Sequence, residues 1–263
     1  MLTQLFIAVD AATPAPQKAA YGIVPMFTDA WHNSNFLPII TAGILALMLF
    51  FTFYILLTKY LEQNKVMGEA KNVGARFWNA PSLKDAANTL PKDTAYRQIV
   101  DDGLLAQEQH GKLTDPVDQH DWTLSALNRS QAAINSELGG GLAFLATVGS
   151  TAPFIGLFGT VVGILSALVK IGAAGQASID AVAGPVGEAL YMTAFGLLTA
   201  VPAVLAYNWL QRRNKAISEA LAAFANDIYG YMGSGGVIKP AVRAAAPAKA
   251  PAAAPAKPMA PKA

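Results

Sequence analysis

The chain has 263 residues, of which 53% are hydrophobic and 14% are charged, and its formal net charge is +2. With a mean hydropathy of +0.35, this composition is typical of membrane proteins and argues against a soluble enzyme. The lack of cysteine excludes disulfides and thiol catalysis, and the three histidines are too scattered to share a metal. We therefore expect no catalytic residues, no cofactor and no metal site.

Residues 1–35 come before the first long apolar run and are expected to form an extension outside the membrane. A cleaved signal peptide would need a basic start and a longer apolar core than this segment has. Residues 21–35 contain apolar side chains and Trp31, a residue type that anchors proteins at the membrane surface. This part is therefore predicted to be an amphipathic segment on the outer face of the membrane.

Three apolar runs are long enough to cross a hydrocarbon layer of about 30 Å, which takes about 20 helical residues. The predicted transmembrane helices cover residues 36–58, 138–171 and 185–210. No charge interrupts the core of the first two, and the third contains Glu188. The chain is therefore predicted to be an all-α membrane protein with three long transmembrane helices.

The basic residues predict the orientation of these helices. Lys59 and Lys65 follow the first run, and Arg212 and Arg213 follow the third, whereas the turn at 172–184 contains no Lys or Arg. Cytoplasmic loops are rich in Lys and Arg. We therefore expect the N-terminus outside and the C-terminus in the cytoplasm, and the basic ends of the helices make an anionic phospholipid a plausible partner.

Residues 59–137 form the longest polar stretch. Apolar residues recur there at helical intervals, and Pro81, Pro91 and Pro116 predict breaks between helices. The stretch has no nucleotide-binding loop and no nucleophile paired with a base, so we expect neither an enzyme nor a nucleic-acid partner. It is predicted to form a cytoplasmic helical bundle, with 211–233 as a further helical extension and the Ala/Pro/Lys-rich tail 234–263 disordered.

The second apolar run carries small or kinking residues on one helical face, at alternating spacings of four and three. They are Gly149, Pro153, Gly156, Thr160, Gly163 and Ala167, with Gly159 completing a GxxxG pair beside them. Small residues let helix backbones approach closely in lipid. The face packs helices either within one subunit or between several subunits around an axis. The Thr160 hydroxyl either bonds to the carbonyl four residues earlier or faces a wet interior.

The third run contains the only carboxylate of the three, Glu188, on one face with Thr199 and Pro202, while Thr193 lies about 140° around an ideal helix. A charge at membrane depth costs several kcal/mol and is a functional-site hypothesis by default. Residues 189–211 alone are long enough to span, which would leave Glu188 as a solvated carboxylate at the helix start. The residues leave both readings open.

Two sequence segments favour a functional role for Glu188. LATVGSTAPFIGLF at 145–158, continued by GTVVGI, resembles the second transmembrane helix of the ExbB, TolQ and MotA family, with the ExbB branch most similar. GEALYMTAFGLLTAVPAVLAYN at 187–208 resembles the third helix of that family. The resemblance covers roughly residues 142–208.

This resemblance implies an inner-membrane subunit with its N-terminus in the periplasm, so that 172–184 is a periplasmic turn. It also implies a homopentamer whose second and third helices line a central pore around a single-span ExbD-like partner. The complex would use the proton-motive force to energise TonB for iron-siderophore and cobalamin-type uptake. Glu188, Thr160 and Thr193 match family positions of the proton pathway, and Thr199 is kept as a possible pore-facing residue.

Three alternatives stay open. A TolQ-like subunit would serve envelope integrity instead of TonB. A non-conducting assembly scaffold would leave all proton chemistry to the partner, with Glu188 at the interface. A self-contained channel is disfavoured, because three spans with one carboxylate lack an inverted repeat. The choice of H⁺ over Na⁺ rests on the resemblance alone.

Overall fold

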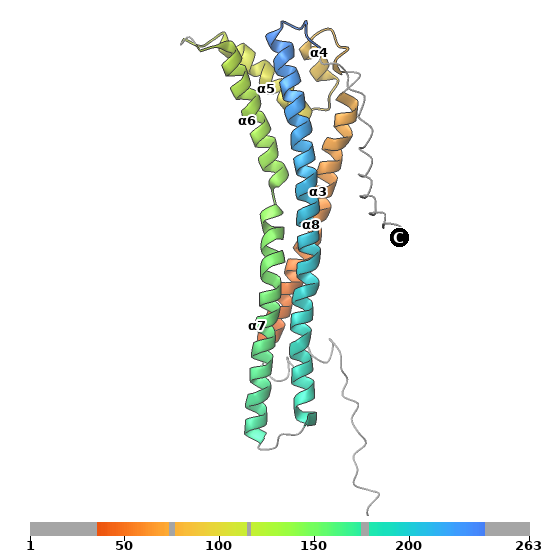
Figure 1. The fold of residues 1–263 in the computed structure, drawn as a ribbon, viewed down its shortest axis with the longest axis vertical. Helices are drawn as coiled ribbons and strands as arrows, with labels where there is room; N and C mark the ends of the chain where they lie inside the picture. The colour runs from red at the N-terminus through yellow and green to blue at the C-terminus, as the bar shows by residue number, and fades with distance from the viewer. Residues whose placement is uncertain (1–35, 74–76, 115–116, 175–178, 240–263) are drawn as a thin grey trace, which may run out of the picture. The chain divides into compact units, whose positions relative to one another are not determined.

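The computed structural model describes residues 36–73, 77–114, 117–174 and 179–239. These residues contain no strand, which confirms the all-α prediction. The helices in Figure 1 are α3 (Phe36–Asn72), α4 (Leu83–Asn88), α5 (Ala95–His110), α6 (Gln119–Gly139), α7 (Leu142–Ala174) and α8 (Ile179–Gly233). The predicted extension at 1–35 and the tail from residue 240 onward lie outside the described residues.

Among the described residues, three helical segments are long and apolar enough to cross a membrane: one in α3, one in the stretch of α6 and α7, and one in α8. The prediction of three long membrane-spanning helices is therefore confirmed at the level of helix length and composition. Large apolar side chains on these helices face outward, such as Phe154 at 70% and Leu205 at 65% exposure. Such a surface suits lipid or another apolar helix, and it would be costly in water.

α3 and α7 continue past the expected ends at 58 and 171, to Asn72 and Ala174, and two further differences change the organisation of the chain. α7 begins at Leu142 and not at 138, because Gly141 has a φ of 81°, a left-handed conformation that ends the regular α6 geometry. α8 starts at Ile179, so part of the expected turn at 172–184 is helical, and it continues without interruption through Pro202 to Gly233. The expected third span and the 211–233 extension are thus one helix.

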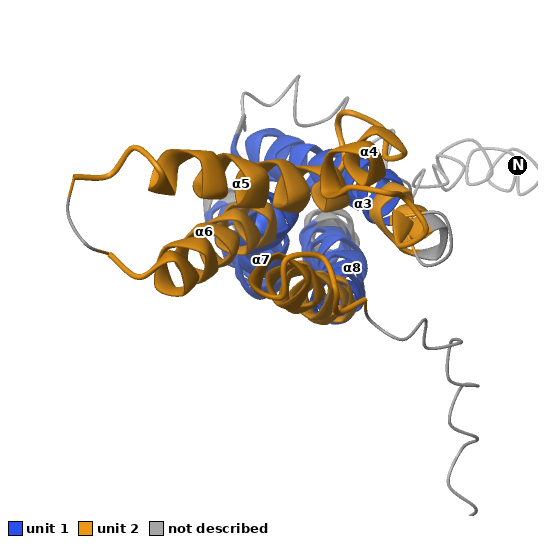
Figure 2. Ribbon diagram, turned by 90° about the horizontal axis from the view of Figure 1, so that it is seen from above, with its two compact units in different colours: residues 1–63, 137–215 blue, residues 64–136, 216–263 orange. Residues whose placement is uncertain are grey.

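The chain divides into two compact units, shown in different colours in Figure 2. Unit 1 comprises residues 1–63 and 137–215 and includes most of α3, all of α7 and the first part of α8. Two groups of buried residues pack along the described parts of its three helices, one around Leu45, Val148 and Ala203, the other around Leu145 and Leu210. Alanine and glycine are common at these contacts, which lets the helices lie close together.

Unit 2 comprises residues 64–136 and 216–263. Its short helices lie between the prolines that predicted the breaks: α4 between Pro81 and Pro91, and α5 between Pro91 and Pro116. Ser82 and Thr94 cap these two helices, each accepting a hydrogen bond from the backbone amide three residues on. These caps satisfy amides that the first helical turn leaves without partners.

An aromatic cluster fills the core of unit 2, with Phe224 packed edge-on against Phe77 and Tyr96. Tyr96 is almost fully buried. Burial, with a smaller contribution from the negative charge of Glu69, raises the pKa of Tyr96 to about 12. The Tyr96 phenol is therefore neutral at every physiological pH.

Candidate functional site

α7 and α8 pack backbone against backbone at a pair of glycines. A Cβ atom built on Gly156 would lie 2.6 Å from the carbonyl oxygen of Met192 and 3.0 Å from the Cα of Gly196. A Cβ built on Gly196 would lie 2.7 Å from the carbonyl oxygen of Ala152. No side chain fits at either position without moving the helices apart.

The other small residues of the α7 face extend this contact in both directions. A Cβ on Gly149 would lie 2.5 Å from Val204 Cγ2, and a Cβ on Gly163 would lie 2.9 Å from Ala189 Cβ. Gly159 lies against α3 as well, since a Cβ on this residue would lie 3.0 Å from Thr41 Cγ2. The structure therefore places Gly149, Gly156, Gly159 and Gly163 at helix contacts within one chain, while Pro153 and Pro202 are half-buried.

The close approach brings two of the predicted site residues together. Thr160, 7% exposed, donates its hydroxyl hydrogen to the carbonyl oxygen of Gly156 at 3.0 Å, and its oxygen is also hydrogen bonded to the hydroxyl of Thr193 on α8. Because the Thr160 hydrogen is used by Gly156, Thr193 is the donor in the bond between the two threonines. Thr193 is half-buried, so its oxygen can still accept a hydrogen bond from a further group.

Thr199 lies six residues beyond Thr193 on α8, about 9 Å along the helix axis. It is buried, and its hydroxyl donates to the carbonyl oxygen of Phe195 at 2.9 Å. This is the ordinary bond of a threonine to its own helix. The structure thus joins Thr160 to Thr193 and places Thr199 on its own, one and a half turns away.

The backbone of Glu188 lies within α8, nine residues after the helix begins. Its side chain lies outside the described part of the structure. The neighbouring Ala189 is buried against Gly163 of α7. The helix therefore continues past Glu188 in both directions, and the carboxylate is carried by a helical residue five positions before Thr193.

A polar cluster at one end of unit 1 was not predicted from the sequence. Lys59 and Gln63 on α3 and Asn214 on α8 donate hydrogen bonds to backbone carbonyls of α6 and α8. The signal available in the sequence was the run Gly139, Gly140 and Gly141, which interrupts a helix and leaves carbonyls that need partners. The long polar side chains supply those partners.

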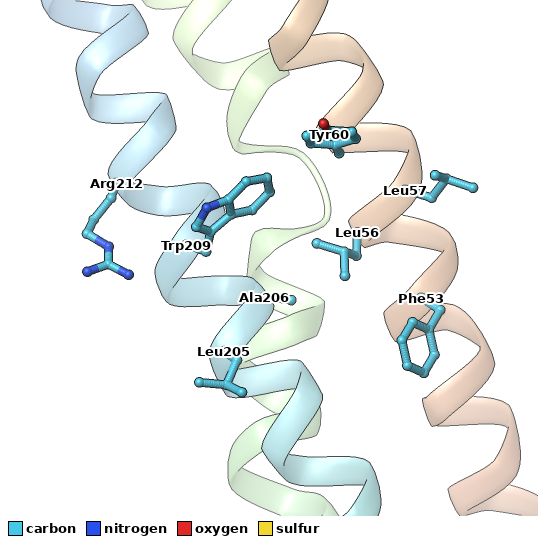
Figure 3. Close-up of a pocket in the computed structure, with 8 residues that line it drawn as sticks. All are labelled: Phe53, Leu56, Leu57, Tyr60, Leu205, Ala206, Trp209 and Arg212. Carbon is cyan, nitrogen blue, oxygen red and sulfur yellow. The ribbon is translucent and has the colours of Figure 1, made fainter.

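An apolar groove lies between α3 and α8 in unit 1, with a volume of about 750 Å³ (Figure 3). Its walls are Phe53, Leu56, Leu57, Tyr60, Leu205, Ala206 and Trp209, and Arg212 lines it as well. Tyr60 and Trp209 contact each other with ring centroids 5.6 Å apart, and the guanidinium of Arg213 lies over both rings. The groove is therefore apolar, with the cationic side chains of Arg212 and Arg213 beside it.

Among the described residues, no group of three or more His, Asp or Glu side chains is placed to hold a metal ion. In the described part of unit 1, hydroxyl and amide side chains form hydrogen bonds between apolar helices that pack closely together.

Comparison with known proteins identifies a family and several relatives of this chain. Residues 93–223 match the model of the MotA/TolQ/ExbB proton channel family. The chain is 38% identical over 185 residues to the biopolymer transport protein ExbB of Xanthomonas campestris pv. campestris, covering 66% of this chain and 73% of that protein. It is 42% identical over 170 residues to ExbB of Neisseria gonorrhoeae, covering 59% and 77%. It is also 36% identical over 172 residues to the Tol-Pal system protein TolQ of Haemophilus influenzae, covering 60% and 72%.

Proposed function

The chain belongs to the MotA/TolQ/ExbB proton channel family, and we propose that within it the protein is an ExbB-like subunit of an inner-membrane, proton-driven motor. With an ExbD-like single-span partner it energises TonB for outer-membrane uptake of iron-siderophore and cobalamin-type substrates. The observation that carries this proposal is the hydrogen-bonded pair of Thr160 and Thr193, which joins α7 and α8 within the matched region. The identity to proteins named ExbB supports the choice of branch.

The threonine pair can serve a carboxyl group in both of its protonation states. A protonated carboxyl of the partner donates to the free acceptor site on the Thr193 oxygen. When that carboxyl loses its proton, Thr193 turns its hydrogen from Thr160 toward the new negative charge, and charge-assisted bonds are the stronger ones. The Thr160 bond to Gly156 is unchanged throughout, so the carboxyl group has a hydrogen-bond partner in both protonation states. The ionised state loses the bond between the two threonines, and the stronger charge-assisted bond to the carboxylate offsets that loss.

Glu188 acts in this mechanism as the residue that receives protons from the periplasmic side. It precedes Thr193 by five residues, about 7.5 Å along α8. A carboxyl group can bind and release a proton, which a threonine hydroxyl does not do at neutral pH. A second carboxyl on the partner then lies between Glu188 and the cytoplasm, with the threonine pair at the transfer point.

The assembly that fits this mechanism is a homopentamer with α7 and α8 around a central pore that holds the partner. The outward apolar side chains of α3, α7 and α8 suit subunit contacts and lipid. The N-terminus lies in the periplasm and the C-terminus in the cytoplasm, where unit 2 forms a helical bundle. The pentamer is inferred from the family resemblance, and the orientation is inferred from that resemblance and from the distribution of Lys and Arg.

We expect the groove between α3 and α8 to bind an anionic phospholipid. An acyl chain fits the apolar walls, and a phosphate can accept hydrogen bonds from Arg212 at the cytoplasmic side. Trp and Tyr are typical of the membrane interface, and Tyr60 and Trp209 line the same groove in contact with each other.

A TolQ-like role is the second candidate, because relatives named TolQ are 34% to 36% identical to this chain. Such a protein would serve the Tol-Pal system and not TonB. A scaffold that leaves proton chemistry to the partner is the third. The three candidates predict different results for one substitution in two cellular assays.

The test uses cells lacking the native subunit, with the chain co-expressed with its ExbD-like partner, as wild type or as Glu188→Gln. For the proposed function, wild type restores TonB-dependent uptake of an iron-siderophore complex and Glu188→Gln abolishes it at equal expression and assembly. Uptake that persists in the variant supports the scaffold. Wild type that restores detergent resistance in cells lacking TolQ, but not uptake, supports the TolQ-like role.

A further inference from the structure

The last turn of α6 is bound by side chains from two other helices. The Nζ of Lys59 donates to the carbonyl oxygen of Glu137 at 2.7 Å, and the Nδ2 of Asn214 donates to that of Leu138 at 2.8 Å. α6 ends at Gly139, so these carbonyls lack the amides that a continuing helix would supply. Glu137 also accepts from the amide of Gly140 at 3.0 Å. The helix end is therefore capped from outside.

Both donors are held in place by further hydrogen bonds. The Nε2 of Gln63 donates to Asn214 Oδ1 at 2.6 Å and to the carbonyl oxygen of Leu210 at 3.1 Å, and Gln63 is 0% exposed. With its oxygen accepting from Gln63, Asn214 directs its amide nitrogen to Leu138. Lys59 forms a second bond at 2.7 Å to Glu62. These interactions fix the direction of each donor before it reaches α6.

The joint between α6 and α7 is packed against α3. A Cβ on Gly141 would lie 2.9 Å from Ile55 Cγ2, and the φ of 81° at Gly141 disfavours any other residue. A Cβ on Gly140 would lie 3.1 Å from the Glu137 carbonyl oxygen and 3.5 Å from Lys59 Nζ. The three consecutive glycines therefore form a specific turn and not a loose linker.

We call Lys59, Gln63 and Asn214 the polar collar. Unit 1 ends at Gln63 on α3, resumes at Glu137 on α6 and ends again at Lys215 on α8. The collar therefore binds together the three chain segments at the points where each one leaves unit 1. A turn of three glycines at such a point would absorb movement unless other groups hold it in place.

We propose that the polar collar consists of positioning residues that hold the α6–α7 turn in one geometry, so that a displacement of α7 or α8 reaches the last turn of α6, at residues 137–139. The collar acts through the backbone carbonyls of Glu137 and Leu138, and it touches neither the proton nor the threonine pair. Its consequence for energy coupling rests on the proposed function, whereas its effect on the turn does not.

The test compares Lys59→Met, Asn214→Ala and the conservative Lys59→Arg in the full chain, purified with its single-span partner. The control is Lys112→Met, which removes another lysine from an ion pair, with Glu108 at 2.8 Å, in which both side chains are exposed. Hydrogen exchange of the amides of residues 137–145 is expected to be about tenfold faster in Lys59→Met and Asn214→Ala. Exchange in Lys59→Arg and Lys112→Met is expected to stay within about twofold of wild type.

A second measurement separates positioning from mere stability. Uptake per assembled complex is expected to fall about fivefold or more in Lys59→Met and Asn214→Ala and to be restored in Lys59→Arg. Unchanged exchange in both variants overturns the claim that the collar holds the turn. Faster exchange with wild-type uptake per complex overturns the positioning role. If the wild-type chain serves the Tol system instead of TonB, the same variants are scored for detergent resistance per complex. The positioning role of the collar is therefore tested even if the proposed TonB function is wrong.

Discussion

Two buried threonines share the same local hydrogen bond and differ in one contact across helices. Thr52 donates to Met48 at 2.8 Å within α3, and Thr160 donates to Gly156 within α7 but also accepts from Thr193. Substitution of Thr by Val removes the hydroxyl and keeps the branched shape, so the two positions form a matched pair.

We expect Thr160→Val to lower TonB-dependent uptake about tenfold or more, because Thr193 loses the acceptor that holds its hydrogen while the partner's carboxyl group is protonated. Thr52→Val is expected to change uptake by less than about twofold. The measurement is siderophore uptake at equal amounts of assembled complex. Equal losses in the two variants would show that any buried hydroxyl matters and that the cross-helix pair has no special role.

At the scale of helices, the contact between α7 and α8 is limited by the size of Gly156. A valine there would place its Cβ 2.6 Å from the Met192 carbonyl oxygen, which belongs to the backbone and cannot turn away. Gly43 on α3 is the control, since a Cβ at that position meets no atom within 4 Å.

We expect Gly156→Val to destabilise the protein by about 1–3 kcal/mol or more through overpacking, and Gly43→Val to leave it nearly unchanged. Thermal unfolding of the purified protein in detergent measures the difference. A melting temperature that falls equally in both variants would mean that helix propensity and not the close approach decides the effect.

The small-residue face of α7 could be predicted from the sequence because its determinants are local, but the sequence left open whether this face packs within one subunit or between several. The spacing of Gly149, Gly156 and Gly163 places them on one helix face whatever that face contacts. The residue on α8 that each one meets was not predictable, since the register of two helices depends on packing along their whole length. Thr160 and Thr193 were singled out by family resemblance, and the bond between them is visible only in the structure.

The polar collar shows the opposite case. Gln63 and Asn214 are 151 positions apart, and nothing in their local sequence indicates that they share a hydrogen bond. The break at Gly141 was also missed, because the apolar run continues across it from Leu138 and hydropathy does not register a change of backbone conformation. Long-range polar contacts and positive φ angles are set by tertiary structure, so periodicity alone does not reveal them.

For the whole protein, the groove between α3 and α8 predicts a stability that depends on the surrounding lipid. A ligand that binds the folded state alone stabilises it by RT ln(1 + [L]/Kd), about 2.7 kcal/mol at a concentration of 100 Kd. We expect phosphatidylglycerol to raise the melting temperature of the delipidated protein by several degrees and phosphatidylcholine to raise it much less. The anionic headgroup makes the difference, because Arg212 lines the groove and Arg213 lies over the rings of Tyr60 and Trp209 beside it.

The variant that tests this expectation is Arg212→Gln, with Arg129→Gln as the control. Arg129 is also an exposed arginine near a tryptophan, with its guanidinium 5.8 Å from the Trp122 ring, but it lies in unit 2. Loss of the phosphatidylglycerol effect in Arg212→Gln alone would place the headgroup at the groove. Equal stabilisation by both lipids would mean that the acyl chain alone binds there. If neither lipid stabilises the protein, the apolar walls of the groove are covered by a second protein surface instead, because an open groove of this composition is unfavourable in water.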